Sequence, residues 1–391
     1  MAGIARKETI MAIIIGGDIV PVETNTALFE RGKAEELIGT ALSELLRDAD
    51  LRIFNLETPL TDQQNPIGKN GPHLCSSTMA VNGIKAMGID LLTLGNNHIM
   101  DQDADGLLST INTLDSTGIM HLGAGKDLDE AQKPFHIEIN GKRYGIYACV
   151  EHEFSTAGEN KPGANPFDSL ETPDHIAQLK SQCDYAIVLY HGGKEQYRYP
   201  SPNLQKTCRK LIEKGADLVI CQHSHCIGCK EEYLHGKIIY GQGNFLFDHK
   251  DNDYWKTGLL ISISDSGEID YIPIIKEENK VRLATDQKAE EILKAFHARS
   301  EEILRPGFVQ ERYNQLAESV LSDYILFFRG INIRGKAYRI INKLTRSKAR
   351  RAIVKSIIKK RGYGMRNYIE CESHRELFLQ GLERFNHGKA E

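Results

Sequence analysis

The sequence predicts an α/β fold, because short β-branched runs alternate with helical patterns over residues 11–273. Glycine and polar residues bound these runs, as they bound buried strands. Residues 135–148 alternate apolar and polar side chains on either side of Asn140-Gly141, which predicts a hairpin. A second strand pair is expected over 258–275, so the sheets should be mixed.

Helices are predicted wherever apolar residues recur at spacings of three and four. One helix is expected over 34–47, and others over 79–87 and 106–118. A further helix covers 203–214 and stops before Gly215, a residue suited to a helix end. Helices that alternate with strands in this way favour a layered α/β protein.

The length of 391 residues favours one large domain with an appendage. We place the domain at 11–275 and a helical region at 276–391. Residues 329–366 contain fourteen Lys or Arg and no Asp or Glu. The rest of the chain then holds 35 basic and 53 acidic residues, so the net charge of −4 hides a strong separation of charge.

No run approaches the roughly 18 apolar residues of a membrane span. The apolar stretch before Gly16 is too short for a signal peptide, and no cleavage site follows it, so it is interpreted as the first strand. The eight cysteines show no disulfide framework. These features predict a cytoplasmic protein.

Six apolar runs end in a polar residue that a metal could use, and the last of these runs, at 237–244, ends at Asn244. In sheets covered by helices, ligands bind beyond the carboxyl ends of the strands. Carboxylate and amide oxygens mixed with imidazoles suit Mn, Fe, Zn or Mg better than thiolates would, so one or two divalent cations are expected. The predicted metal ligands are Asp18, Glu57, Asn97, His191, His223 and His225.

The strongest local motif is LGNNHIMD at 94–101. The amide oxygen of Asn97 can ligate a metal, while His98 stands off the metal and protonates a leaving oxygen. Asp101 can orient the imidazole of His98. The alternative interpretation is a polar turn with a helix cap.

The motif QHSHC at 222–226 is the second signal. On an extended segment alternate residues point the same way, so His223 and His225 would reach one cluster. Cys226 and Cys229 beside them offer the alternative of a structural zinc site, although no second ligand pair lies nearby in the sequence.

Asp18 and Glu57 each follow a strand and precede a turn, so each alone would be explained as a turn or capping acid. Together with the Asn and His residues they are better explained as ligands, and a carboxylate can bridge two cations. Four further residues are candidates for substrate contact, with solvent exposure as the alternative for those on the loop 191–198. They are Lys194, Glu195, Arg198 and Asn244.

These motifs resemble the CapA family, the poly-γ-glutamate capsule synthesis branch of the calcineurin-like metallophosphoesterase superfamily. The resemblance covers roughly 11–275. It implies a four-layer α/β/β/α sandwich with mixed sheets and a dinuclear site, with the six ligands named above, His98 as general acid and Asp101 behind it. The matching segments are GGD at 16–18, NLE at 55–57, NNHIMD at 96–101, HGGKEQYRYPSP at 191–202, GADLVICQHSH at 215–225 and YGQGNFLFD at 240–248.

Three positions depart from the superfamily's usual motifs. The first motif is usually Asp-x-His, whereas Asp18 is followed by Ile19 and Val20, so one ligand is missing. The second carboxylate is usually Asp in a Gly-Asp motif, and here it is Glu57. The residue before His-x-His is usually Gly, and here it is Gln222.

The resemblance implies a metal-dependent hydrolase of the phosphoesterase type, involved in making capsule, poly-γ-glutamate or another anionic exopolymer. Its substrate would be an anionic polymer or a small phosphorylated molecule. The alternative is a non-catalytic, metal-containing accessory or binding subunit of a polymer synthesis or export complex. A nucleic-acid phosphoesterase follows from the basic segment alone and is not favoured, because that segment lacks aromatic platforms for single strands.

The basic segment 329–366 combines Ile and Val with Lys and Arg. Such a helix can lie on anionic lipid, where each cation contributes about 1 kcal/mol. The segment therefore predicts a peripheral contact with the inner membrane face or with a synthase complex. The alternative is a solvated helix that packs its apolar stripe on the domain.

Overall fold

We describe a computed structural model of the chain, which covers residues 11–247, 252–331, 343 and 348–387. These residues form two compact units, the first ending at Gln310 and the second beginning at Glu311. The first unit extends past the predicted segment 11–275, because helix α9 (Asp286–Glu302) packs against strands of both large sheets.

The first large sheet is mixed and has seven strands in the order β15-β14-β13-β1-β2-β3-β4. Strands β1 to β4 are parallel, and the other three are antiparallel to their neighbours. The strand pair predicted over 258–275 is confirmed as β13 and β14. The strands are β1 Met11–Ile19, β2 Leu51–Leu56, β3 Leu91–Thr93, β4 Met120–Leu122, β13 Thr257–Ser264, β14 Ile269–Glu277 and β15 Lys280–Leu283.

The second large sheet has six strands in the order β11-β12-β10-β9-β7-β6, with a parallel centre and antiparallel edges. The predicted hairpin is confirmed as β6 and β7, which turn at Asn140-Gly141 where both residues have positive φ. A small third sheet pairs β5 (Ala124–Gly125) with β8 (Gly163–Ala164). The six strands are β6 Phe135–Ile139, β7 Lys142–Val150, β9 Tyr185–His191, β10 Leu218–Gln222, β11 Lys230–Tyr233 and β12 Gly236–Tyr240.

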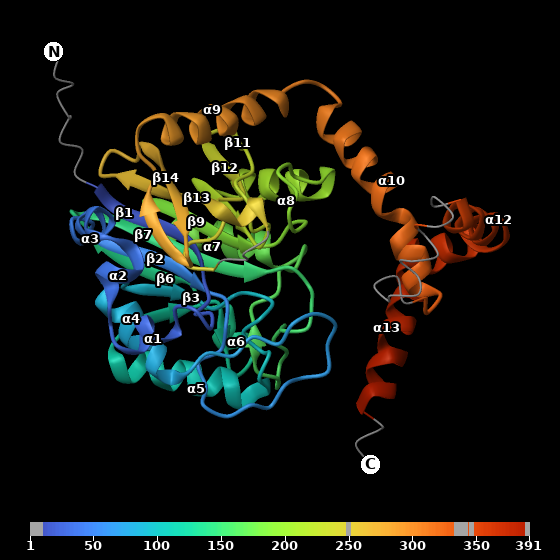
Figure 1. Cartoon of the computed structure of the whole chain (residues 1–391), viewed down its shortest axis with the longest axis horizontal. Helices are drawn as coiled ribbons and strands as arrows, with labels where there is room; N and C mark the ends of the chain where they lie inside the picture. Colours follow the sequence, from blue (N-terminus) through green and yellow to red (C-terminus); the bar gives the residue numbers. More distant parts are fainter. Residues whose placement is uncertain (1–10, 248–251, 332–342, 344–347, 388–391) are drawn as a thin grey trace. The chain divides into compact units, whose positions relative to one another are not determined.

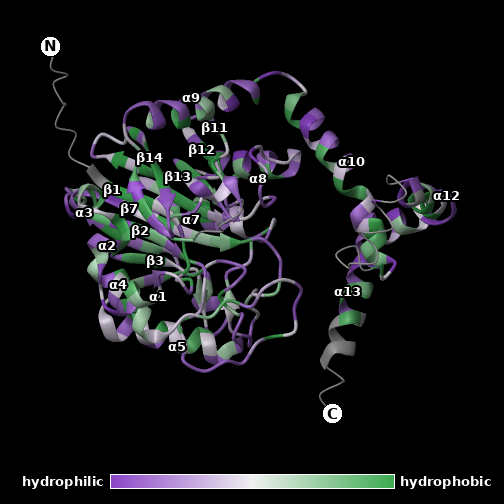
Figure 2. Cartoon of the chain, in the orientation of Figure 1, coloured by the Kyte–Doolittle hydropathy of each residue, from purple (hydrophilic) through white to green (hydrophobic). Residues whose placement is uncertain are grey.

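The two large sheets pack face to face around an apolar layer that includes Ile13, Ile53, Ile146 and Ile220. Helices α1 to α5 cover the outer face of the first sheet, and α7 and α8 cover that of the second (Figure 1). Figure 2 shows hydrophobic ribbon concentrated in the strands, with mixed colours along the helices. The predicted four-layer α/β/β/α sandwich with mixed sheets is confirmed.

The single helix predicted over 34–47 is wrong, because two helices meet at Gly39. Gly39 has φ 75°, and the side chain of Arg282 fills the space beside it and donates to the carbonyl of Leu37 at 3.0 Å. The other predicted helices are confirmed. The helices of the first unit, besides α9, are α1 Thr26–Glu30, α2 Ala34–Ile38, α3 Thr40–Arg47, α4 Val81–Ala86, α5 Asp103–Thr117, α6 Leu128–Ala131, α7 Thr172–Gln182 and α8 Pro202–Glu213, with 3-10 turns η1 Thr78–Ala80 and η2 Asp253–Lys256.

The predicted C-terminal helical region is also confirmed. It contains α10 (Phe308–Phe328), α12 (Lys348–Glu370) and α13 (Glu372–His387). Ile325, Leu326 and Val354 form a small apolar core between α10 and α12. Much of the predicted basic segment, at 332–342 and 344–347, lies outside the described residues. Within the described part of the chain, no helix has the length and apolar character needed to cross a membrane.

Candidate metal centre

Asp18 lies at the carboxyl end of β1, directly opposite Asn55 of β2. Both side chains are buried, and Nδ2 of Asn55 donates to Oδ1 of Asp18 at 2.8 Å. The second oxygen, Oδ2, lies 3.4 Å from Nδ1 of His225. Asn55 therefore fixes the carboxylate so that one oxygen faces an imidazole from the other sheet.

Glu57 follows β2 and has no exposed surface. By hydrogen-bond geometry neither of its carboxylate oxygens accepts a hydrogen bond from a described residue, and its near partners are two imidazoles. Its Oε1 lies 3.1 Å from Nε2 of His191, and its Oε2 lies 4.0 Å from Nδ1 of His225. A buried carboxylate without hydrogen bonds is costly, and divalent cations held against its two oxygens would offset that cost. Glu57 thus fits a metal ligand.

Nε2 of His191, at the end of β9, is surrounded by other ligand atoms. Oδ1 of Asn97 lies 3.0 Å from it, Oε1 of Glu57 lies 3.1 Å from it, and Nδ1 of His223 lies 3.2 Å from it. Four donors from four different segments therefore converge on one point, which is the arrangement that a bound cation requires.

His223 and His225 lie on a tight loop, so the extended segment predicted for them is wrong. Strand β10 ends at Gln222, and the two histidines have φ 77° and φ 53°. Non-glycine residues rarely adopt such values, and they concentrate at functional sites. Both imidazoles nevertheless reach the cluster.

Charge in the cluster is divided between anions and imidazoles. Burial opposes ionisation of Asp18, but contacts with His225 and His191 outweigh it and hold the pKa of Asp18 below its ordinary value. Burial alone would lower the pKa of His225, whereas Glu57 and Asp18 raise it to about 9. Burial together with the charges of His191 and His225 holds the pKa of His223 well below its ordinary value, so His223 is neutral.

The six predicted metal ligands form one ligand cluster, and Glu57 is shared within it. One group joins Glu57 to His191 and His223, and another joins it to Asp18 and His225. In each group the donor atoms lie within 4.8 Å of one another. The residues of the cluster could therefore hold metal, with Glu57 between two positions. The ligand cluster is Asp18, Glu57, Asn97, His191, His223 and His225.

Glu151 and Glu153 lie against the ligand cluster and were missed by the sequence analysis. With His223 they form a third group of possible metal ligands. Nδ2 of Asn97 donates to Oε2 of Glu153 at 2.9 Å, which directs the amide oxygen of Asn97 toward His191. Glu151 follows the last residue of β7, so the strand-end rule that found the other ligands would have found it too.

His98 and Asp101 form a pair beside the ligand cluster. Nδ1 of His98 lies 2.6 Å from Oδ2 of Asp101, and the backbone N–H of Leu74 donates to the same oxygen at 2.6 Å. The ammonium of Lys69, almost fully buried, contacts the other oxygen of Asp101 and lies 3.2 Å from Nδ1 of His98. Lys69, which the sequence analysis missed, therefore helps to fix Asp101.

The predicted substrate contacts on the loop after β9 differ in their surroundings. Lys194 and Glu195 are exposed, and their contact with substrate stays a prediction. Arg198 donates to the carbonyl of Ile227, two residues after His225, at 2.8 Å, and its contact with substrate also stays a prediction. Arg299 of α9 donates to the next carbonyl, that of Gly228, at 2.7 Å. The two guanidinium groups thus hold the backbone that directly follows the loop with His223 and His225.

The structural zinc site considered for Cys226 and Cys229 finds no support. Both thiols are buried and free, and burial raises the pKa of each. No group of possible metal ligands among the described residues includes either cysteine.

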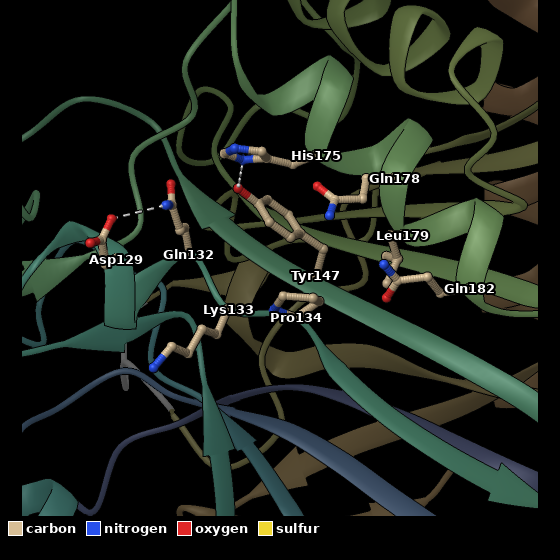
Figure 3. Close-up of a pocket in the computed structure, with 9 residues that line it drawn as sticks. All are labelled: Asp129, Gln132, Lys133, Pro134, Tyr147, His175, Gln178, Leu179 and Gln182. Carbon is tan, nitrogen blue, oxygen red and sulfur yellow. Dashed lines mark hydrogen bonds between the residues drawn. The ribbon is translucent and has the colours of Figure 1, made fainter.

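A separate cavity of about 230 Å³ lies between α7 and the residues before β6 (Figure 3). The hydroxyl of Tyr147 and Nδ1 of His175 lie 3.0 Å apart at its edge and point toward each other. The cavity shares no residue with the ligand cluster.

The family model for the bacterial capsule synthesis protein PGA_cap matches residues 12–249, which is more than half of the chain. The chain belongs to the PGA_cap family. The matched residues include all six members of the ligand cluster together with His98 and Asp101. The resemblance to CapA is therefore confirmed.

Two relatives are similar to this chain over about half of its length. The PGA biosynthesis protein CapA of Bacillus subtilis is 28% identical over 220 residues, which cover 55% of this chain and 58% of CapA. A probable polyglutamine synthesis accessory protein of Mycobacterium tuberculosis is 29% identical over 226 residues, which cover 54% of this chain and 60% of the relative. The chain thus spans little more than half the length of these relatives.

Two solved structures are similar at low identity. A novel phosphatase from Mycoplasma pneumoniae has a TM-score of 0.41 and 15% identity, covering 68% of this chain and 93% of the phosphatase. A putative 5'-nucleotidase from Staphylococcus aureus has a TM-score of 0.39 and 14% identity, covering 73% of this chain and 57% of the other.

Proposed function

We propose that the chain is a metal-dependent hydrolase of phosphoesters that acts in the synthesis of a capsule or another anionic exopolymer, such as poly-γ-glutamate. The observation that carries the proposal is Glu57, a fully buried carboxylate without hydrogen bonds that two groups of ligand atoms share. Membership of the PGA_cap family supplies the biological process.

The ligand cluster would hold two divalent cations, drawn from Mn, Fe, Zn and Mg. Its mixture of carboxylate, amide and imidazole donors suits these ions. When bound, such ions activate water and neutralise negative charge on the scissile group. Binding requires loss of the proton from His225, whose pKa the neighbouring carboxylates raise to about 9.

His98 would give a proton to the leaving oxygen. Asp101 accepts a hydrogen bond from Nδ1 of His98, which leaves Nε2 as the ring nitrogen that can transfer a proton to substrate. Lys69 and the N–H of Leu74 hold Asp101 in turn, so the ring has one orientation. His98 directly follows Asn97 in the sequence, which places the pair next to the ligand cluster.

The test is hydrolysis of p-nitrophenyl phosphate and bis(p-nitrophenyl) phosphate by Mn²⁺-loaded protein. His98→Gln should lower the rate by about 100- to 10,000-fold and leave the metal content unchanged. His175→Gln is the matched control, because His175 lies in the separate cavity and should keep the full rate. Equal rates for wild type and His98→Gln would refute the assignment of the acid.

The second candidate is a non-catalytic accessory subunit that uses its metal to grip an anionic polymer. Two points favour it: the M. tuberculosis relative is described as a probable accessory protein, and the resemblance implies a ligand at the position that Val20 occupies. Metal-loaded protein that hydrolyses neither ester but binds poly-γ-glutamate would select this candidate over the hydrolase.

We further propose that the second unit contacts an anionic membrane or a synthase complex from the cytoplasmic side. Helix α12 has eight Lys or Arg and one acidic residue, and Ile353, Ile358 and Tyr363 are exposed on it. All eight cysteines are free, which suits a reducing compartment.

Liposome flotation tests the membrane contact. Recovery should be higher with phosphatidylglycerol than with phosphatidylcholine vesicles, and conversion of the three basic residues 359–361 to Glu should remove the difference. Conversion of the exposed Lys126, Lys161 and Lys206 to Glu is the matched control. Equal recovery of wild type with both vesicles would reject a lipid surface.

A further inference from the structure

The ligand cluster has two halves, and the half around His191 is complete by itself. Nε2 of His191 lies near one oxygen of Glu57, the amide oxygen of Asn97 and Nδ1 of His223. This half therefore offers four protein donors: two imidazoles, one carboxylate oxygen and one amide oxygen.

The half around His225 has the same form once Asn244 is counted. Nδ1 of His225 lies 2.9 Å from Oδ1 of Asn244, 3.4 Å from Oδ2 of Asp18 and 4.0 Å from Oε2 of Glu57. Again an imidazole meets one oxygen of Glu57, an amide oxygen and a fourth donor. Without Asn244 this half would have only three donors from the described residues.

The side chain of Asn244 is held with its oxygen facing the cluster. Nδ2 of Asn244 donates to the carbonyl of Phe247 at 3.0 Å, which leaves Oδ1 on the side of His225. Asn244 is fully buried, so no solvent competes for that oxygen. A buried amide whose nitrogen is fixed in this way presents a preorganised ligand oxygen.

The backbone around Asn244 is fastened to the segment that carries Asp18. The backbone N–H groups of Phe245 and Leu246 both donate to the carbonyl of Asp18 at 3.0 Å. A Cβ on Gly17 would lie 2.0 Å from the carbonyl oxygen of Gly243, so only glycine at 17 permits this approach. The chain therefore places Asn244 and Asp18 side by side by main-chain contacts.

We propose that Asn244 is a metal ligand that completes the cation position formed by Asp18, Glu57 and His225. The inference rests on the proposed metal-dependent function and assigns Asn244 a role in place of the predicted substrate contact. The position supplies three oxygens and one nitrogen, a set that suits a hard cation such as Mn²⁺ or Mg²⁺.

Metal content after dialysis against Mn²⁺ tests the proposal, because it requires no activity. Wild type should bind two ions per chain. Asn244→Leu and Asn97→Leu should each bind one, since each removes one amide oxygen from a different half. Asn165→Leu is the matched control: Asn165 is also buried and donates once to a carbonyl, that of Ala148, and this variant should bind two ions.

Asn244→Asp separates a ligand from a structural residue. Asp keeps the oxygen but cannot donate to the carbonyl of Phe247, so a ligand role predicts two bound ions and a purely structural role predicts the behaviour of Asn244→Leu. The inference alone would be overturned if Asn244→Leu bound two ions with unchanged affinity while circular dichroism showed that the variant is folded. No metal in wild type would overturn the proposed function as well.

Discussion

Glu57→Gln should stabilise the metal-free protein and abolish its response to metal. Glu57 has no exposed surface, and neither of its oxygens accepts a hydrogen bond from a described residue. Glutamine keeps the size of the side chain and removes the buried charge. The substitution should therefore stabilise the protein without metal, and it removes a ligand that both halves of the ligand cluster share.

The magnitude follows from two opposing effects. An unsatisfied buried polar group costs about 1–3 kcal/mol, and more if it is charged. Part of that cost is already offset, because Glu57 lies against two imidazoles: against the effect of burial it raises the pKa of His191, and with Asp18 it raises that of His225 to about 9. We expect a net gain of about 1 kcal/mol in the free energy of unfolding, which corresponds to about 2–4 °C in Tm.

In the presence of Mn²⁺, wild type should be more stable than Glu57→Gln. A ligand at 100 times its Kd adds about 2.7 kcal/mol for each site, so wild type should gain about 5 kcal/mol from two ions. Glu57→Gln should gain almost nothing. Thermal unfolding in EDTA and in excess Mn²⁺ measures both effects in one experiment.

Glu231→Gln is the matched control. Glu231 is also buried, but its oxygens accept hydrogen bonds from Arg209, Tyr240 and Gln205. Its conversion to Gln should lower Tm in EDTA and leave the gain from Mn²⁺ intact. A Glu57→Gln protein that is less stable than wild type in EDTA, or that gains as much from Mn²⁺, would refute the reasoning.

Two further predictions test the surroundings of the ligand cluster, and a third tests an exposed ion pair at the opposite ends of strands β7 and β9. Gly17→Ala should lower the free energy of unfolding by about 1–3 kcal/mol and reduce metal content, because its Cβ would lie 2.0 Å from the carbonyl oxygen of Gly243. Gly68→Ala is the control: its Cβ would meet nothing within 4 Å, so this variant should match wild type in Tm and in bound Mn²⁺. Lys69→Met should lower the hydrolysis rate about tenfold or more at unchanged metal content, since Lys69 holds Asp101, which orients His98. An unchanged rate would show that Lys69 does not help to position His98. Arg143 lowers the pKa of Asp184 from its ordinary 3.8 to about 2. The pair therefore stabilises the fold at a pH above 3.8, and this stabilisation is lost as the pH falls from 3.8 toward 2. Asp184→Asn should thus unfold more easily at pH 7 and show a shallower loss of Tm between pH 4 and pH 2, and an identical acid profile would contradict this.

The strand-end rule predicted much of the site because five of its strands are parallel to their neighbours. Strands β1, β2 and β3 run parallel in one sheet, and β9 and β10 run parallel in the other, so residues at their carboxyl ends gather at common edges. The sequence therefore indicated which residues would lie together before any long-range contact was known. Glu151 was missed only because the rule was not applied to the second strand of the hairpin.

Other features depend on contacts that no local pattern contains. Lys69 lies in a long loop between β2 and η1, and it reaches Asp101 because the loop folds back through the bridge between Leu60 and Ser76. The break at Gly39 depends on Arg282, more than 240 residues away in sequence. The positive φ angles of His223 and His225 are uncommon for non-glycine residues, and the apolar run before them does not indicate them.

The most direct test of the account is the anomalous difference density of a crystal grown with Mn²⁺. Two peaks are expected, one on each side of the Glu57 carboxylate, with Asn97 near one and Asn244 near the other. An absence of any peak among Asp18, Glu57, His191 and His225 in fully loaded crystals would contradict it.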